Sequence, residues 1–175
     1  MKILAFGATN SRNSINQQFA RYAASLVPNA EVEVLDLNDY ELPIFSFERE
    51  EQLGQPELAQ KFYKKLGEAD AIIISFAEHN GSYAVAYKNT FDWVSRINQK
   101  VFQEKPMLLL ATSPGPGGAA NVLAGAVGSA PYFAGDVRAS VSLPSFYDNF
   151  DMAAGKVTNA EIDTKLKEAV EELVK

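Results

Sequence analysis

The sequence predicts an α/β fold: one domain over residues 1–175, built as a five-stranded parallel sheet with helices on both faces. Short apolar segments alternate with longer amphipathic ones in the order βαβαβαβαβα. The central segments Asp70–Phe76 and Lys105–Thr112 are apolar at nearly every position, which is typical of strands covered on both sides. A chain of 175 residues with 47% hydrophobic and 22% charged residues is long enough and apolar enough for one globular core.

The first part of the chain supplies two strands and a helix. Lys2–Gly7 is a short apolar run that ends in glycine and predicts a buried strand. Glu31–Leu37 at first alternates polar and apolar residues, as a half-exposed edge strand does. Between them, one helical stripe precedes the stop signal Pro28-Asn29, and its members are Ile15, Phe19, Tyr22 and Leu26.

Residues Leu42–Gly54 lack a clear periodicity and are predicted as a loop or excursion. Its aromatic residues Phe45 and Phe47 suit a subunit contact or a lid, or equally packing on their own domain. Pro56-Glu57 then resembles the first turn of a helix. That helix carries an apolar repeat of four, at Leu58, Phe62 and Leu66.

The second half repeats the pattern. The predicted strands are Asp70–Phe76, Lys105–Thr112 and Val137–Val141, and two of the predicted helices are Ala84–Ile97 and Ala119–Val127. A capping box with Thr158 as the cap and Glu161 as its partner predicts the start of the final helix. The buried stripe of that helix is Ile162, Leu166, Ala169 or Val170, and Leu173.

Five strands in a chain of this length favour a flavodoxin-like three-layer sandwich with strand order 2-1-3-4-5. Ligands of such sheets bind beyond the carboxyl ends of the strands, at the switch point beside strands one and three. The residues that directly follow each strand are therefore the candidates for a functional site.

The composition excludes several classes of chemistry. Without cysteine there is no disulfide, zinc-thiolate site, iron–sulfur cluster or thiol nucleophile. His79 is the single histidine, so we expect no metal site and no Ser-His-Asp triad. With 16 Lys and Arg against 22 Asp and Glu, the net charge of −6 argues against a nucleic-acid partner. No apolar run reaches membrane-spanning length and no signal peptide is visible, so we expect a cytoplasmic protein without a membrane partner.

The loop over residues 7–16 is the first candidate site. It holds three hydroxyl side chains, two asparagines before the helix, Arg12 and the start of a helix, whose N–H groups and partial positive charge suit a phosphate. Ser14-x-x-Gln17 also fits a capping box among ordinary turn residues, so the residues alone leave both interpretations open. The loop has neither a G-x-x-x-x-G-K-[ST] nor a G-x-G-x-x-G pattern.

The loops after the two central strands are the other candidates. Residues 76–83 contain Asn80-Gly81, whose amides and carbonyls can face a flat heterocycle, although Glu78 and His79 also fit ordinary solvated side chains. Residues 112–118 contain two prolines and three glycines, which predict a rigid loop with an accessible backbone rather than a simple turn.

These loops resemble those of the NAD(P)H-dependent FMN reductases of the flavodoxin-like group, which includes quinone, azo-dye and chromate reductases. The resemblance covers nearly the whole chain. The segments that carry it are Ser14-Ile15-Asn16, Glu78-His79-Asn80-Gly81-Ser82, Lys88-Asn89-Thr90-Phe91-Asp92-Trp93 and Ser113-Pro114-Gly115-Pro116-Gly117-Gly118. The chain departs from the family pattern in the first two of these loops. Thr9 stands where the family usually has Ser, and Ser11 where it usually has Arg, with Arg12 one position later. Ala77 replaces the usual Pro, and His79 replaces the usual Tyr.

The resemblance implies an FMN site without a catalytic side chain of its own. The residues it assigns to the phosphate are Thr9, Ser11, Ser14, Ile15 and Asn16, with Arg12 within possible reach. Those it assigns to the ring are Glu78, His79, Asn80, Gly81, Ser113, Pro114, Gly115 and Gly118. Lys88, Asn89, Asp92 and Trp93 would brace the second loop or build a subunit interface.

The implied activity is hydride transfer from NAD(P)H to the flavin and then to a small-molecule electron acceptor, by a ping-pong mechanism. A homodimer or homotetramer is the assembly that the resemblance implies. The alternatives are a flavodoxin-like FMN-binding electron carrier and a non-catalytic regulatory domain on the same fold. No basic cluster for a 2′-phosphate is evident, so the residues alone do not favour NADPH.

Overall fold

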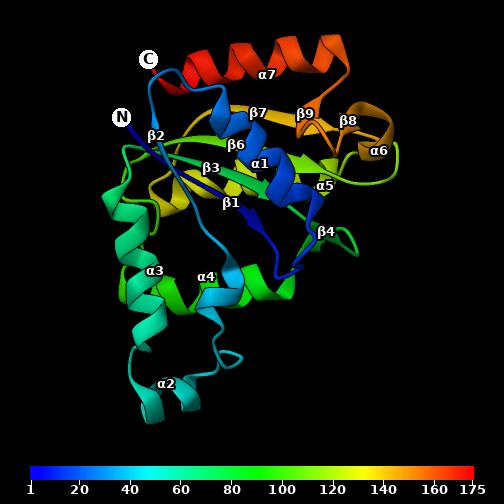
Figure 1. The fold of residues 1–175 in the computed structure, drawn as a ribbon. Coiled ribbons are helices and arrows are strands. Elements are labelled where there is room, and N and C mark those ends of the chain that lie inside the picture. The colour runs from blue at the N-terminus through cyan, green and yellow to red at the C-terminus, as the bar shows by residue number, and fades with distance from the viewer.

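The computed structural model describes all 175 residues, and its centre is a five-stranded parallel sheet with the order β2-β1-β3-β6-β7 (Figure 1). The order counted along the sheet is 2-1-3-4-5, which confirms the predicted topology. The strands of this sheet are β1 (Lys2–Ala8), β2 (Glu31–Val34), β3 (Ala71–Phe76), β6 (Pro106–Thr112) and β7 (Asp136–Leu143).

Helices cover both faces of the sheet, as predicted (Figure 1). One face carries α1 (Ile15–Ser25) and α7 (Ala160–Leu173), and the other carries α3 (Glu57–Glu68), α4 (Val85–Ile97) and α5 (Ala120–Ser129). The remaining helices are short: η1 (Leu37–Tyr40), α2 (Phe47–Leu53), η2 (Ala130–Phe133) and α6 (Phe146–Asn149). Two small hairpins complete the fold, β4 (Glu78–His79) with β5 (Ser82–Tyr83) and β8 (Phe150–Asp151) with β9 (Lys156–Val157).

The core is divided in two by the sheet because successive strand residues point to opposite faces. On β1, Ile3 and Ala5 pack beneath α1 and α7, whereas Leu4 and Phe6 pack beneath the helices of the other face. The central strand β3 is buried at all six positions. This explains why its sequence is continuously apolar and not alternating.

The segment predicted as a loop over Leu42–Gly54 contains the helix α2, so that prediction is wrong for Phe47–Leu53. Ser46 caps the helix by accepting a hydrogen bond from the Arg49 amide at 3.2 Å. None of the seven helical residues is buried, so the helix has no apolar stripe for a periodicity argument to detect. Phe45 packs on its own domain, with its ring centroid 5.1 Å from that of Trp93.

The predicted capping box at the last helix is also wrong, because Asn159 and not Thr158 is the cap. The Asn159 Oδ1 atom accepts from the amides of Glu161 at 3.1 Å and Ile162 at 3.2 Å. The helix therefore begins one residue later than a Thr158 cap requires, and Glu161 instead pairs with Lys165 at 2.7 Å. Asn159 is held in this position by its side-chain hydrogen bond to Asn149, at 3.0 Å.

The boundaries of several other elements also differ from prediction. The edge strand predicted to reach Leu37 ends at Val34, because Asp36 caps the short helix η1. The last strand is longer than predicted at both ends, and α5 continues to Ser129.

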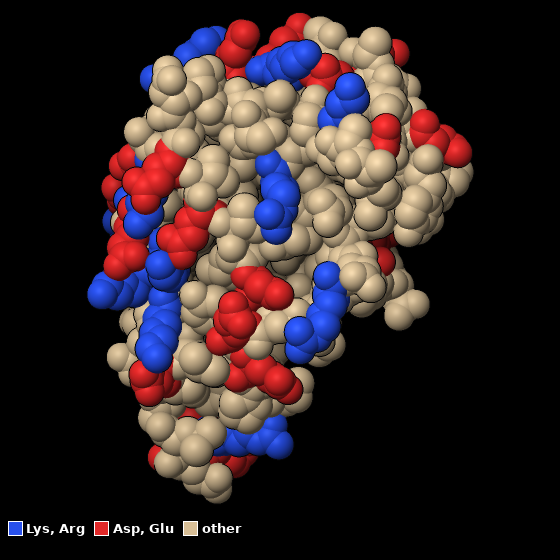
Figure 2. All heavy atoms as spheres, in the orientation of Figure 1, with Lys and Arg blue, Asp and Glu red and all other residues tan.

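Charged side chains lie mostly in mixed groups on the face that Figure 2 draws, where Lys and Arg lie beside Asp and Glu. Along α3, Lys61 pairs with Glu57 at 2.6 Å and Lys65 pairs with Glu33 of β2 at 2.7 Å. No helix has both the length and the apolar character that crossing a membrane requires.

Candidate functional site

A cleft of about 230 Å³ lies at the carboxyl ends of β1, β3 and β6. These strands are neighbours in the sheet, with Ala8 beside Phe76 and Phe76 beside Ala111, so the loops that follow them meet at one edge. The cleft is lined by thirteen residues: Thr9, Ser11, Asn13, Ser14, Ile15, Asn16, Ala77, Glu78, His79, Thr112, Ser113, Pro114 and Tyr147.

Nine of the fourteen residues predicted to hold the cofactor line this cleft, and they come from all three predicted loops: Thr9, Ser11, Ser14, Ile15, Asn16, Glu78, His79, Ser113 and Pro114. The other five do not line it: Arg12, Asn80, Gly81, Gly115 and Gly118. Cofactor binding by the whole set stays a prediction.

The first turn of α1 presents donors to the cleft. Ser14 is the N-cap, and its Oγ accepts from the Gln17 amide at 3.1 Å. Ile15 and Asn16, at the first two helical positions, have no acceptor for their amides within the helix. The Thr9 hydroxyl accepts from the Ser11 amide at 3.1 Å. Because Thr9 and Ser14 use their oxygens as acceptors, their O–H protons remain to donate.

The Asn16 side-chain amide is already hydrogen-bonded within the protein, so it is not free to bind a ligand. It is 3% exposed and bonded to two strands. Its Oδ1 accepts from Ser75 Oγ at 2.7 Å and from the Thr112 amide at 3.1 Å, and its Nδ2 donates to the Thr112 carbonyl at 3.2 Å. Asn16 thereby fixes α1 to the carboxyl ends of β3 and β6, and only its backbone amide is left without a partner at the cleft.

The second loop is a β-hairpin and not an open loop. Its two turn residues, Asn80 and Gly81, have φ angles of 53° and 78°, as a two-residue hairpin turn requires. Asn-Gly is the strongest short-range signal for such a turn, so the sequence contained the information needed to predict it. The turn places Asn80 and Gly81 at the exposed tip, whereas Glu78 and His79 face the cleft.

Glu78 ties this hairpin to the start of α5. Its Oε2 accepts from the Val122 amide at 2.8 Å, within the first turn of that helix. A carboxylate is stabilised there by the unpaired amides and by the helix dipole. We conclude that Glu78 positions the hairpin wall of the cleft.

The third loop is held against the strand β7 and the segment that follows it. Gly118 has φ +57°, and a Cβ there would lie 2.3 Å from Ser142 Oγ and 3.1 Å from Pro144 Cα. Gly118 is therefore required for packing inside the protein. The Gly115 carbonyl accepts from the Ser145 amide at 2.9 Å, while Ser113 and Pro114 remain at the cleft.

Tyr147 is the clearest functional candidate that sequence reasoning missed. It is 65% exposed, lies on the four-residue helix α6 and lines the cleft. Its ring contacts Phe146 edge-on, with centroids 5.5 Å apart. No motif marks α6, so only the fold brings this aromatic ring to the site.

The Lys-Asn-x-x-Asp-Trp segment of α4 braces a different loop from the predicted one. Asn89 accepts from the Phe45 amide at 2.8 Å and donates to the Leu42 and Pro43 carbonyls. Trp93 Nε1 donates to the Pro43 carbonyl at 2.7 Å. Lys88 and Asp92 pair with each other, with Nζ to Oδ1 at 2.7 Å.

The fold and the cleft define the class of protein. A parallel sheet of order 2-1-3-4-5, with a hydroxyl-lined cleft and a helix N-terminus at its switch point, is the arrangement of the flavodoxin-like proteins. Within this class, the chain belongs to the NADPH-dependent FMN reductase family, whose model matches residues 1–148.

Two curated relatives are similar to the chain over part of its length. An NAD(P)H-dependent FMN reductase of Pseudomonas aeruginosa is 31% identical over 122 residues, which are 69% of this chain and 64% of the relative. A 2-hydroxy-1,4-benzoquinone reductase of Burkholderia sp. is 33% identical over 122 residues, with the same shares. The matched segment thus spans slightly less than two thirds of each relative.

Solved structures share the fold at lower identity. The flavoenzyme NAD(P)H:(acceptor) oxidoreductase FerB of Paracoccus denitrificans superposes with a TM-score of 0.77 at 23% identity, covering 99% of this chain and 94% of FerB. An FMN-dependent NADH-azoreductase of Bacillus anthracis, solved in complex with FMN, superposes with a TM-score of 0.63 at 14% identity, covering 99% and 98% of the two chains.

Proposed function

We propose that this protein is an FMN-dependent NAD(P)H oxidoreductase that passes reducing equivalents to a small-molecule acceptor by a ping-pong mechanism. The candidate acceptors are a quinone, an azo compound, a metal oxyanion and free flavin. Family membership supports the redox chemistry. The observation that carries the proposal is the cleft itself, where the α1 N-terminus and three hydroxyl side chains of the first loop face the switch point of the sheet.

The residues at the first loop fit the phosphate of FMN. Thr9, Ser11 and Ser14 offer hydroxyl donors, and Ile15 and Asn16 offer backbone amides at the positive end of a helix dipole. The five donors belong to one wall of the cleft, and no Lys or Arg lines it. Hydroxyls and a helix N-terminus are sufficient for a phosphate, so the absence of a cationic side chain is compatible with this assignment.

The other walls suit a planar ring. Hydride acceptance and delivery are the chemistry that FMN supplies when it is bound. The hairpin residues Glu78 and His79 lie on one wall, and Ser113 and Pro114 on another. The His79 imidazole offers an N–H donor at the cleft, and Glu78 keeps its strand in place through Val122. No side chain is assigned a covalent role.

The test is a spectroscopic and kinetic one on the full chain. We expect the purified protein to retain added FMN and to oxidise NADH or NADPH in the presence of 1,4-benzoquinone, with parallel lines in double-reciprocal plots. Retention of FMN without nicotinamide oxidation would assign the protein to the electron carriers. A protein that binds no FMN would be a non-catalytic domain, and the proposal would be wrong.

A matched pair of serine variants tests the phosphate assignment. Ser14 and Ser46 each cap a helix through one side-chain acceptor, but only Ser14 lines the cleft. Replacing either by alanine costs about 1 kcal/mol of helix capping. We expect Ser14→Ala to weaken FMN binding and Ser46→Ala to leave it unchanged, as measured by fluorescence titration of FMN. Equal affinities in the two variants would remove the phosphate assignment.

We propose further that the chain assembles as a homodimer or homotetramer. Its exposed large apolar residues include Ile44, Phe47 and Val85, and Ile44 and Val85 line one shallow pocket. Exposed apolar residues of this kind suit an interface. Sedimentation equilibrium of the wild-type protein should give twice or four times the chain mass, and a monomer at micromolar concentration would contradict this assembly.

A further inference from the structure

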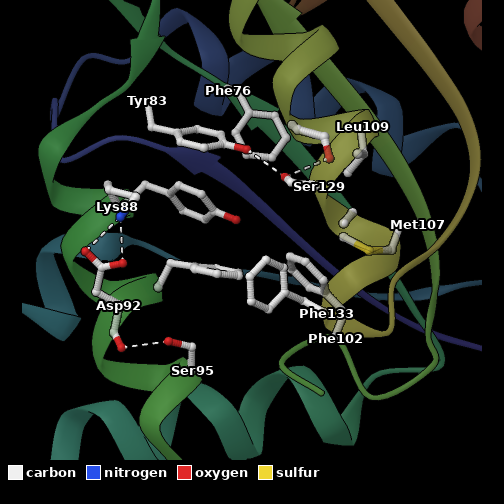
Figure 3. Close-up of a pocket in the computed structure, with 14 residues that line it drawn as sticks. Phe76, Tyr83, Lys88, Asp92, Ser95, Phe102, Met107, Leu109, Ser129 and Phe133 are labelled. Carbon is white, nitrogen blue, oxygen red and sulfur yellow. Dashed lines mark hydrogen bonds and ion pairs between the residues drawn. The ribbon is translucent and has the colours of Figure 1, made fainter. Parts of the chain in front are cut away.

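A second cavity, of about 210 Å³, lies between α4 and α5 on the face of the sheet that those helices cover (Figure 3). We call it the aromatic cavity. Ten of its fourteen lining residues are hydrophobic, and the rings include Phe76, Tyr83, Phe102 and Phe133. Met107 and Leu109 of β6 are also part of its lining (Figure 3).

The aromatic cavity is separate from the cleft at the strand ends. The two share no lining residue. The β4–β5 hairpin lies between them, with His79 of β4 at the cleft and Tyr83 of β5 at the aromatic cavity. A ligand could therefore occupy one site while the other is filled.

The size and walls of the aromatic cavity suit one or two aromatic rings. An apolar cavity of roughly 150 Å³ is enough for benzene in a protein interior, and this one is larger. Its walls are consecutive ring contacts: Tyr83 to Tyr87 at 5.2 Å, Tyr87 to Phe91 at 6.0 Å, and Phe91 to Phe133 at 4.7 Å between centroids. Such rings offer edges and faces to a planar guest.

The charges at its rim favour a neutral ligand. Lys88 and Asp92 are the only charged lining residues, and they neutralise each other, with Nζ 2.7 Å and 2.9 Å from the two carboxylate oxygens (Figure 3). A second polar pair in the lining is also satisfied, since Tyr83 Oη lies 3.3 Å from Ser129 Oγ. Neither pair leaves a charge for an ionic guest.

One polar group in the lining lacks a partner. The Tyr87 side chain is 4% exposed and lines the aromatic cavity, and its hydroxyl makes no hydrogen bond to the protein. Burial raises the pKa of Tyr87 well above its ordinary value, with a smaller contribution from Tyr83, so the hydroxyl keeps its proton. The hydroxyl oxygen is not fully enclosed, since Gln55 Oε1 is the single enclosed side-chain atom without a hydrogen-bond partner. The Tyr87 hydroxyl is therefore accessible and has no acceptor in the protein, and a guest that supplies an oxygen would give it one.

We propose that the aromatic cavity is a second ligand site, which binds a neutral one- or two-ring aromatic molecule whose hydroxyl or carbonyl oxygen accepts a hydrogen bond from Tyr87. The lining walls supply apolar contact for the rings, and Tyr87 selects for the oxygen. The proposal concerns a site apart from the FMN cleft and stands independently of the function proposed above.

The test uses two probes that differ by one oxygen, 2-naphthol and naphthalene, with the wild-type full chain and Tyr87→Phe. We expect 2-naphthol to bind the wild type with one molecule per chain, by equilibrium dialysis. Tyr87→Phe should weaken 2-naphthol binding about fivefold, the loss of one hydrogen bond, while naphthalene binding changes less than twofold. The thermal midpoint of Tyr87→Phe without ligand should stay close to that of the wild type, because the substitution removes no hydrogen bond within the protein.

Ala126→Leu is the second variant, since Ala126 lines the aromatic cavity and is 2% exposed. It should abolish binding of both probes while FMN titration is unchanged. The proposal is overturned if neither probe binds, if FMN displaces 2-naphthol, or if both variants bind the probes like the wild type. It is also overturned if binding disappears at concentrations where sedimentation shows a dimer and returns on dilution, which would assign this face to a second copy of the chain. FMN retention is read separately, so failure here leaves the proposed oxidoreductase function intact.

Discussion

At the scale of single residues, the Asn16 side chain forms hydrogen bonds that a neighbouring backbone segment would otherwise form. Its amide pairs with both the N–H and the C=O of Thr112, as a neighbouring strand would, and also accepts from Ser75. The three bonds are buried and connect α1 to the ends of β3 and β6. The geometry of the cleft therefore depends on this side chain even though the side chain offers little to a ligand.

Asn16→Ala should destabilise the protein by about 2–4 kcal/mol, because it leaves the Thr112 amide and carbonyl and the Ser75 hydroxyl unpaired in the interior. Urea denaturation followed by circular dichroism measures this difference. Asn38→Ala is the matched control: its amide bonds only Asp36, at an exposed position, and the loss should stay below about 0.5 kcal/mol. Equal stability of the two variants would contradict the bracing role.

Tyr22 and Asp163 form the second residue-scale feature, a link between α1 and α7 with Oη 2.6 Å from Oδ1. Burial raises the pKa of Tyr22 to about 12, and the hydrogen bond and the charge of Asp163 add to the effect. Partial burial would raise the pKa of Asp163, but hydrogen bonds from Lys167 and Tyr22 outweigh it and the pKa is lowered.

The sign of the pH effect follows from these shifts. The folded state favours neutral Tyr22, so its stabilising contribution is complete below about pH 10, the unfolded pKa, and is lost as the pH rises toward 12. The Asp163 contribution is present above about pH 4 and is lost as the pH falls. Tyr22→Phe should cost about 1 kcal/mol at pH 7 and make the decline between pH 10 and 12 shallower.

Chemical denaturation at a series of pH values measures both effects. Tyr132→Phe is the control, because Tyr132 is 80% exposed, and it should follow the wild type throughout. Superimposable curves for Tyr22→Phe and the wild type above pH 10 would show that the link does not hold the Tyr22 proton.

At the scale of elements, helix ends show how local sequence and tertiary contacts compete. Thr158 and Asn159 are both good cap residues, and a reciprocal partner three residues later favours Thr158 in the sequence. In the fold, Asn149 fixes the Asn159 amide, and this contact decides which residue caps α7. The choice depends on a residue ten positions away, which a motif of four residues does not include.

Asn159→Ala should therefore destabilise the protein by about 1 kcal/mol, whereas Thr158→Ala should change its stability by less than about 0.5 kcal/mol. Thermal unfolding of the two variants in parallel is the measurement. The reverse order would restore the capping box that the sequence suggests.

Element type was predictable wherever an element buries one face. The strands β1, β3 and β6 and the helices α1, α3 and α4 all carry a continuous apolar segment or a stripe, and each is present near its predicted position. The helix α2 buries nothing, and α6 has only four residues, so neither leaves a periodic pattern. The hairpin β4–β5 is different, because Asn80-Gly81 specifies its turn directly.

At the scale of the whole molecule, the topology alone assembles the site. Parallel strands place their carboxyl ends at one edge, so residues separated by about a hundred positions meet there without any contact that the sequence reveals. This is why three predicted loops converge on one cleft. Which residues of a loop face the cleft depends on packing: Gly118 lies against Ser142 and not at the cleft. Tyr147 lines the cleft because the fold places the helix α6 there.

FMN bound at this edge contacts loops from three strands, so its binding should raise the free energy of unfolding of the whole protein. The FMN phosphate should account for much of this increase. FMN at a hundred times its dissociation constant should add about 2.7 kcal/mol to the free energy of unfolding. Riboflavin has the same ring without the phosphate and cannot use the donors of Ser14, Ile15 and Asn16, so it should raise the thermal midpoint much less at the same concentration. Ser14→Ala should reduce the difference between the thermal midpoints measured with FMN and with riboflavin, whereas Ser46→Ala should leave this difference unchanged. Calorimetry measures these midpoints. If FMN and riboflavin stabilise the wild type equally, the α1 N-terminus does not bind the phosphate, and the cofactor lies elsewhere on the strand-end edge.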